Sequence, residues 1–186
     1  MMILLILLFA LVLFIIIFAL KLINIVKKDD FNRTLLFFRR YLFVIFTGLA
    51  LFYIVMIIIC ILTLPTYEYI YVLLVKYIIY SIYFSAIFMT SKKLLNNLSN
   101  NIIFEDANTE YIQEIGSYFI YLSVVEIIAG IVIGIINFLT ADSWAEFRLQ
   151  TNISILLFLV IGIILLIISY ILKKAIEIYK ENQLTI

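Results

Sequence analysis

The sequence predicts an all-α protein, an integral membrane helical bundle of five transmembrane helices with its N-terminus outside and its C-terminus in the cytoplasm. Of the 186 residues, 67% are hydrophobic and only 13% are charged, whereas a soluble domain is about half apolar and about a quarter charged. The mean hydropathy of +1.25 points the same way. We therefore expect a multi-pass protein of the cell membrane, with the lipid bilayer as its main contact.

Five stretches are long and apolar enough to form these spans, because a membrane-crossing helix needs roughly 20 largely apolar residues. They are residues 1–26, 41–64, 69–90, 116–139 and 153–172. The first stretch lacks the basic start and the small-residue cleavage site of a secretory signal, so we expect it to stay as a helix. The segments between the spans are shorter than the roughly 50 residues that a soluble domain needs.

The positions of Lys and Arg predict the orientation. All but two of the 13, Lys76 and Arg148, lie in residues 21–40, 91–115 and 173–186. Positive charge stays on the cytoplasmic side of a membrane protein. These three segments are therefore expected in the cytoplasm.

The expected organisation has three parts. An additional N-terminal transmembrane helix covers residues 1–26, and a basic cytoplasmic connection covers residues 27–40. A four-helix membrane domain then occupies residues 41–186, with a cytoplasmic connection at 91–115 and a cytoplasmic tail at 173–186.

The composition argues against several kinds of chemistry. The chain has no histidine, which is the commonest general base and metal ligand. Its one cysteine, Cys60, cannot form an internal disulfide or a multi-thiolate metal site. The net charge of +1 is too small for a nucleic-acid-binding surface. We expect no enzymatic activity, no cofactor or metal, and no direct binding of nucleic acid.

Two charged residues lie within the predicted spans, Lys76 in the third and Glu126 near the middle of the fourth. Consecutive spans are usually adjacent, so we expect these two residues to form an intramembrane ion pair. Such a pair more often locks two helices in register than takes part in transport. The transport interpretation stays open as the less favoured one.

Small and polar residues on one face of the fourth span predict a helix-packing seam. The seam consists of Gly116, Ser123, Gly130, Gly134 and Asn137. Four of these recur every seven residues and share a face with Glu126, and the Gly-x-x-x-Gly spacing lets another backbone come close. We expect the seam to face Tyr69, Tyr80 and Tyr83 of the third span, with tyrosine hydroxyls donating to Glu126 or Asn137.

The cytoplasmic segments are expected to be helical in part. Residues 91–104 have leucines at helical spacing with asparagines between them, which is typical of an amphipathic extension lying along the membrane interface. Glu105 and Asp106 then mark a helix start, where acidic side chains interact favourably with the helix dipole.

Two motifs in these segments resemble a known family. The end of the chain carries an acid at Glu177 and then Glu181-Asn182-Gln183-Leu184-Thr185-Ile186. The connection carries Phe104 and Asn108, followed by Ile112, Ile115 and Gly116. These features resemble the closing signature and the connection of a bacterial membrane family, domain of unknown function 2975. The resemblance covers about residues 41–186.

The resemblance has three implications. Members of the family are usually described with four spans, so residues 1–26 would be an extra helix. They tend to be basic just after the asparagine, where this chain has Glu110, Gln113 and Glu114. Members are often encoded beside a small helix-turn-helix repressor, which implies a paired membrane and DNA-binding system.

Two functional hypotheses follow. The first is a regulatory interaction protein whose cytoplasmic connection and tail bind a partner, such as a small cytoplasmic DNA-binding regulator. The candidate partner-binding residues are Phe104, Asn108, Glu177, Glu181, Asn182, Leu184, Thr185 and Ile186. The alternative is a small transporter or channel subunit that uses Lys76 and Glu126. The oligomeric state stays open, a homo-oligomer included.

Overall fold

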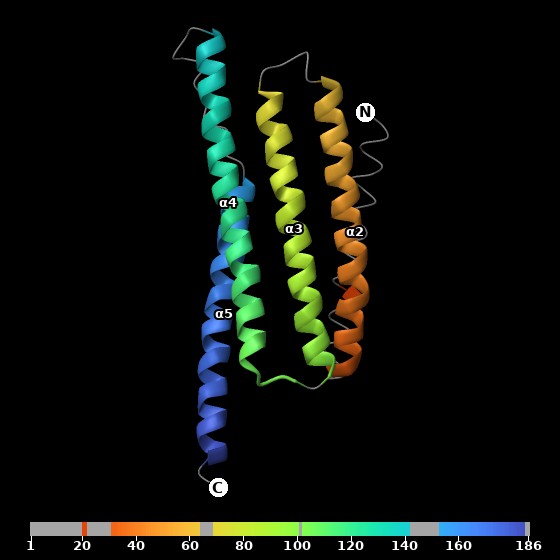
Figure 1. Cartoon of the computed structure of the whole chain (residues 1–186), viewed down its shortest axis with the longest axis vertical. Helices are drawn as coiled ribbons and strands as arrows, with labels where there is room; N and C mark the ends of the chain where they lie inside the picture. The colour runs from red at the N-terminus through yellow and green to blue at the C-terminus, as the bar shows by residue number, and fades with distance from the viewer. Residues whose placement is uncertain (1–19, 22–30, 64–68, 101, 142–152, 185–186) are drawn as a thin grey trace. The chain divides into compact units, whose positions relative to one another are not determined.

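Four long helices make up nearly all of the described chain (Figure 1). The computed structural model describes residues 20–21, 31–63, 69–100, 102–141 and 153–184. The helices are α2 (Phe31–Thr63), α3 (Ile70–Ser99), α4 (Asp106–Ala141) and α5 (Ile153–Leu184). Each is long and apolar enough to cross a membrane, and no strand occurs in these ranges. The all-helical prediction is confirmed there. The predicted first span lies outside the described residues apart from Leu20 and Lys21.

The chain divides into two compact units, residues 1–43 and 44–186. The boundary falls within α2, which begins at Phe31. Residues 31–40, which the sequence assigned to a basic connection, are therefore helical. This segment contains neither glycine nor proline, the two residues least favourable within a helix, so nothing in it stops the helix from starting before the apolar run.

Two helices continue well past the ends of their predicted spans. α3 runs through the predicted extension and ends at Ser99, where the Asn100 N–H donates to the carbonyls of Asn96 and Asn97, both at 3.1 Å. α5 runs through most of the predicted tail to Leu184. Neither extension contains glycine or proline, the residues that commonly end a helix. Each helix therefore continues beyond its apolar run.

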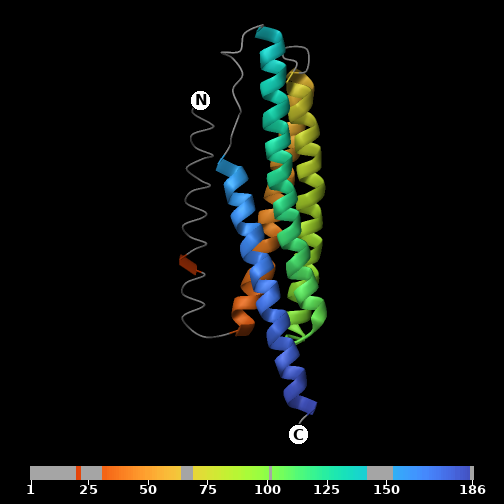
Figure 2. The same cartoon turned by 90° about the vertical axis from the view of Figure 1, so that its left-hand side faces the viewer.

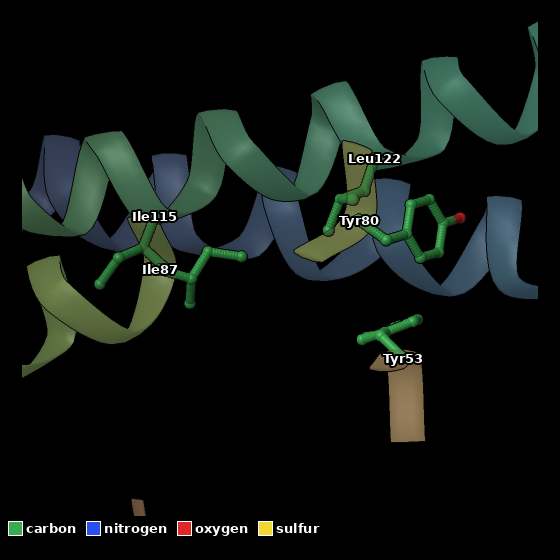
Figure 3. Packing of buried hydrophobic residues seen from close by; sticks show 5 residues of the cluster. All are labelled: Tyr53, Tyr80, Ile87, Ile115 and Leu122. Carbon is green, nitrogen blue, oxygen red and sulfur yellow. The ribbon is translucent and has the colours of Figure 1, made fainter. Parts of the chain in front are cut away.

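The unit of residues 44–186 is held together by α4, which packs against both α3 and α5 (Figure 2). A cluster of buried apolar residues in this unit consists of Tyr53, Tyr80, Ile87, Ile115 and Leu122 (Figure 3). The Tyr53 ring joins α2 to this cluster, 5.7 Å from the Tyr80 ring and 5.4 Å from the Phe84 ring. Leu122 of α4 is fully buried, as expected for the central helix.

Two glycines set the closest approach of α4 to α5. A Cβ on Gly162 of α5 would lie 2.7 Å from Ile120 Cγ1 and 2.8 Å from the carbonyl oxygen of Gly116 on α4. A Cβ on Gly116 would lie 3.0 Å from the carbonyl oxygen of Gly162. Only residues without a side chain let the two backbones come this close, as is common between membrane helices.

Large apolar side chains are exposed along all four helices. Leu62, Ile82, Leu139 and Leu156 are 75%, 63%, 69% and 65% exposed. In water, so much contiguous apolar surface would cause association. The apolar faces fit contact with lipid, which agrees with the prediction of a membrane protein.

Candidate functional site

The first candidate site is the ion pair between α3 and α4. The Lys76 ammonium donates to Glu126 Oε2 at 2.9 Å, and the two side chains are only 13% and 7% exposed. The structure thus brings together the two charged residues that the sequence singled out. A charge this far from water is costly unless it is paired, so each side chain neutralises the other.

Ser154 is a third member of this site, and the sequence analysis did not identify it. Its Oγ donates to Glu126 Oε1 at 3.0 Å from the first turn of α5. Glu126 therefore accepts from α3 through one oxygen and from α5 through the other. A serine at the start of an apolar run has no distinguishing spacing, and only the antiparallel packing of α4 and α5 reveals its role.

Tyr80 completes the surroundings of the pair. Its ring centroid lies 5.6 Å from the Lys76 nitrogen, within the range of a cation–π interaction. Its buried hydroxyl makes no hydrogen bond of good geometry in the described part of the chain, although it is close enough to interact electrostatically with Glu126. Tyr80 is thus the tyrosine that interacts with Glu126, as the sequence analysis expected of a tyrosine on this face. Tyr83 instead contacts the rings of Tyr118 and Tyr121, each at 5.9 Å.

An open groove of about 380 Å³ lies between α3 and α4 beside the pair. Its lining residues are Tyr71, Val72, Val75, Lys76, Ile79, Val125, Ile128, Ala129 and Val132. The walls are almost entirely apolar, so the groove suits a lipid chain better than a file of water molecules. In the described residues the site is a buried, paired charge that links three helices.

The predicted seam of α4 faces protein, but not only the helix that we expected. Gly116 packs on Gly162 of α5 and not on the tyrosine face of α3. Ser123 is fully buried, and its hydroxyl donates to the Ile120 carbonyl of its own helix at 2.7 Å. Gly130 and Gly134 are buried and Asn137 is half-buried. The seam residues therefore pack against protein on a helix that has α3 and α5 as neighbours.

The second candidate site begins with Asn108, which is 1% exposed. Its amide nitrogen donates to the carbonyls of Ile102 and Ile103 at 2.7 and 3.0 Å. Its Oδ1 accepts from the amide of Asn97 on α3 at 3.0 Å. Asn108 thus satisfies two connection carbonyls that no helix would satisfy and fixes the path from α3 into α4.

The end of α5 is attached to the same connection. The Tyr179 ring stacks on Phe104 with centroids 4.8 Å apart and an interplanar angle of 16°. Lys180 pairs with Asp106 at 2.7 Å. Deeper in, Ser169 donates to the carbonyl of Thr109 at 2.8 Å. We call this set of six residues the tail junction: Phe104, Asp106, Thr109, Ser169, Tyr179 and Lys180.

The candidate partner-binding residues fall into three groups. Asn108 is buried, and its amide is hydrogen-bonded within the chain through both its nitrogen and its oxygen, so it shapes the connection. Glu181 and Asn182 are exposed on the last turns of α5, and Glu177, 45% exposed, pairs with Lys174 at 2.7 Å. Leu184 ends the helix. Thr185 and Ile186 lie outside the described residues.

The acidic residues near the start of α4 do not form a metal centre in the described part of the chain, where no three His, Cys, Asp or Glu side chains come together in that way. Glu114 accepts instead from the Thr90 hydroxyl of α3 at 3.3 Å. Asp106 binds Lys180. Both carboxylates hold helices together.

One family model matches the sequence. It is described as "Protein of unknown function (DUF2975)", and the match covers residues 33–186. The match includes all residues of α3, α4 and α5 and begins two residues into α2. No curated protein and no solved structure matches the chain.

Proposed function

The chain belongs to the DUF2975 family of proteins of unknown function, and from this premise we propose that it is a membrane-embedded interaction protein. In this proposal the end of the bundle that carries the tail junction faces the cytoplasm. That end binds a soluble partner, for which a small helix-turn-helix regulator is the first candidate. The chain itself neither catalyses a reaction nor binds nucleic acid.

One observation carries the proposal: two motifs far apart in the sequence form a single surface. Lys180 and Asp106, 74 residues apart, are joined by an ion pair, and the rings of Phe104 and Tyr179 stack beside them. Both pairs are partly exposed at the end of the bundle, so their side chains are accessible to a soluble protein. A surface built from two segments in this way suits recognition of another protein.

The chemistry of this end supports a soluble partner. The last turns of α5 carry an amide and charged side chains of both signs, namely Lys173, Lys174, Glu177, Lys180, Glu181 and Asn182. Such residues are poorly suited to lipid. They suit the polar rim of a protein interface, with the stacked Phe104 and Tyr179 as its aromatic centre.

The test is an in-cell crosslink and pull-down of the full chain against a chain ending at Lys180. The truncation leaves Tyr179 and Lys180 in place, so the tail junction persists while residues 181–186 are lost. Both chains are first shown to reach the membrane in equal amounts. We expect a small soluble DNA-binding protein to be recovered with the full chain and at least tenfold less with the shorter one.

A matched control removes polar groups elsewhere at the end of the bundle. Ser99→Ala with Asn100→Ala changes two exposed residues at the end of α3, and we expect it to recover the partner as the parent does. Because the truncation leaves the tail junction in place, a second variant, Phe104→Ala with Tyr179→Ala, removes its stacked rings. Recovery equal to that of the parent from both the truncated chain and this variant would reject the proposal. So would recovery of membrane proteins alone from both.

A second candidate function is transport through the bundle, favoured by the polar cluster of Lys76, Glu126 and Ser154 inside the spans. Intramembrane charges commonly mark ion or proton paths. The test is flux into proteoliposomes for the parent and for Glu126→Gln, with folding checked by helicity. Transport requires flux above empty liposomes that Glu126→Gln abolishes, and unchanged flux in this variant would exclude a role for the pair.

A further inference from the structure

A strongly basic pocket lies in the unit of residues 1–43, which contains neither of the sites described above. It has a volume of about 650 Å³. Its lining residues are Lys21, Arg33, Leu36, Phe37, Arg39, Arg40 and Tyr41. All seven of these described residues belong to the unit of residues 1–43.

The lining has the chemistry of an anion site. Four of the seven residues are cations and one is a phenol, and none of the seven is acidic. Arg39, Arg40 and Lys21 are exposed, so their charged groups are accessible to a ligand. Guanidinium groups bind phosphate oxygens through paired, charge-assisted hydrogen bonds. A phosphate group is the anion that this arrangement fits best.

The position of the cations along the sequence places them at a membrane boundary. After Arg40, the chain has no charged residue from Tyr41 to Thr63, which is the length of one membrane span. Before Lys21, residues 1–20 also carry no charge. The cations of the pocket therefore lie where an apolar segment ends, at the depth of lipid headgroups.

The apolar part of the lining fits the rest of a lipid. Leu36 is 65% exposed beside the cations, and the Phe37 ring lies 4.3 Å from that of Tyr41 between centroids. An inorganic anion makes no favourable contact with apolar side chains, whereas a phospholipid brings acyl chains next to its phosphate. Basic pockets at this depth commonly hold anionic headgroups.

We propose that the pocket of Lys21, Arg39 and Arg40 binds a phosphate-bearing anion, the phosphodiester headgroup of an anionic phospholipid. Arg33 and Tyr41 also have other interactions, so the proposal depends on Lys21, Arg39 and Arg40. The site is independent of partner binding and of the ion pair. It would fix the start of α2 at the membrane surface.

The test is native mass spectrometry of the purified full chain in detergent, titrated with phosphatidylglycerol, with phosphatidylcholine and with inorganic phosphate. The variant is Arg39→Gln with Arg40→Gln. The matched control, Lys92→Gln with Lys173→Gln, removes two charges from exposed residues outside the pocket. We expect phosphatidylglycerol to bind the parent more tightly than phosphatidylcholine. We expect the pocket variant to weaken that binding about tenfold or more and the control less than twofold.

Each alternative result overturns the proposal. Equal weakening in both double variants would mean general charge attraction. No preference for phosphatidylglycerol would mean that no headgroup is recognised, and displacement of the lipid by equimolar inorganic phosphate would make this a free-anion site. If the pocket variant loses helicity, Lys21→Gln replaces it, and unchanged affinity in that variant rejects the site.

Discussion

The carboxylate of Glu126 on α4 links this helix to α3 and to α5. Lys76 and Ser154 occupy its two oxygens at 2.9 and 3.0 Å. Removing the carboxylate would leave the Lys76 ammonium, 13% exposed, without its partner. A buried charge left alone is worse for folding than the absence of both charges.

We therefore expect Glu126→Ala to lower the free energy of unfolding by about 3–5 kcal/mol. Lys76→Met combined with Glu126→Gln should regain most of this loss, because no unpaired charge remains. Ser154→Ala should cost about 1 kcal/mol, the value of one hydrogen bond. Unfolding followed by circular dichroism in detergent measures all three. A double variant as unstable as Glu126→Ala would show that the charges are needed as a pair.

Asn108 has a comparable role in the first turn of α4. We expect Asn108→Ala to cost about 2–3 kcal/mol, because the carbonyls of Ile102 and Ile103 lose their donor in a place with little water. Asn100→Ala, at an exposed position, should change stability by less than about 0.5 kcal/mol. The same unfolding assay compares the two. Equal effects would mean that the connection tolerates unpaired carbonyls.

At the scale of elements, the contact between α4 and α5 depends on the lack of a side chain at Gly162. An added Cβ would meet both the backbone of Gly116 and the side chain of Ile120. Backbone atoms cannot rotate away, so the helices would have to separate along their length. Crowding of this kind typically costs about 1–3 kcal/mol.

We expect Gly162→Ala to destabilise the bundle by about this amount. Gly48→Ala on α2, where an added Cβ has nothing within 4 Å, is the control and should be neutral or stabilising by up to about 1 kcal/mol, since alanine favours a helix. Thermal unfolding of both variants measures the difference. If Gly162→Ala were as stable as Gly48→Ala, the close approach would not matter for folding.

At the scale of the whole molecule, the proposed orientation puts the α3–α4 connection and the end of α5 on one side of the membrane. We expect Lys92→Cys and Lys173→Cys, each in a Cys60→Ser background, to react with a membrane-impermeant maleimide only from the cytoplasmic side. Leu139→Cys, 69% exposed near the other end of α4, should react only from outside. Labelling of Lys92→Cys and Lys173→Cys from opposite sides would contradict the arrangement.

Residence in a membrane, the four described helices and the two charged residues within them were predictable from the sequence. Each of these rests on local information: a run of about 20 apolar residues predicts a span whatever it packs against, and a charge inside such a run stands out. The resemblance in Phe104, Asn108 and the end of the chain likewise agrees with the family match over residues 33–186.

The tertiary structure decided which residues meet. Ser154 and Gly162 carry no signal in a long apolar helix, and the seam was expected against α3, whereas its first glycine packs on α5. The start of α2 was also missed, at Phe31 rather than near residue 41, because hydropathy marks the edge of lipid and not the end of a helix. Contacts between helices depend on their rotation and crossing, and these emerge only when all the faces are packed together.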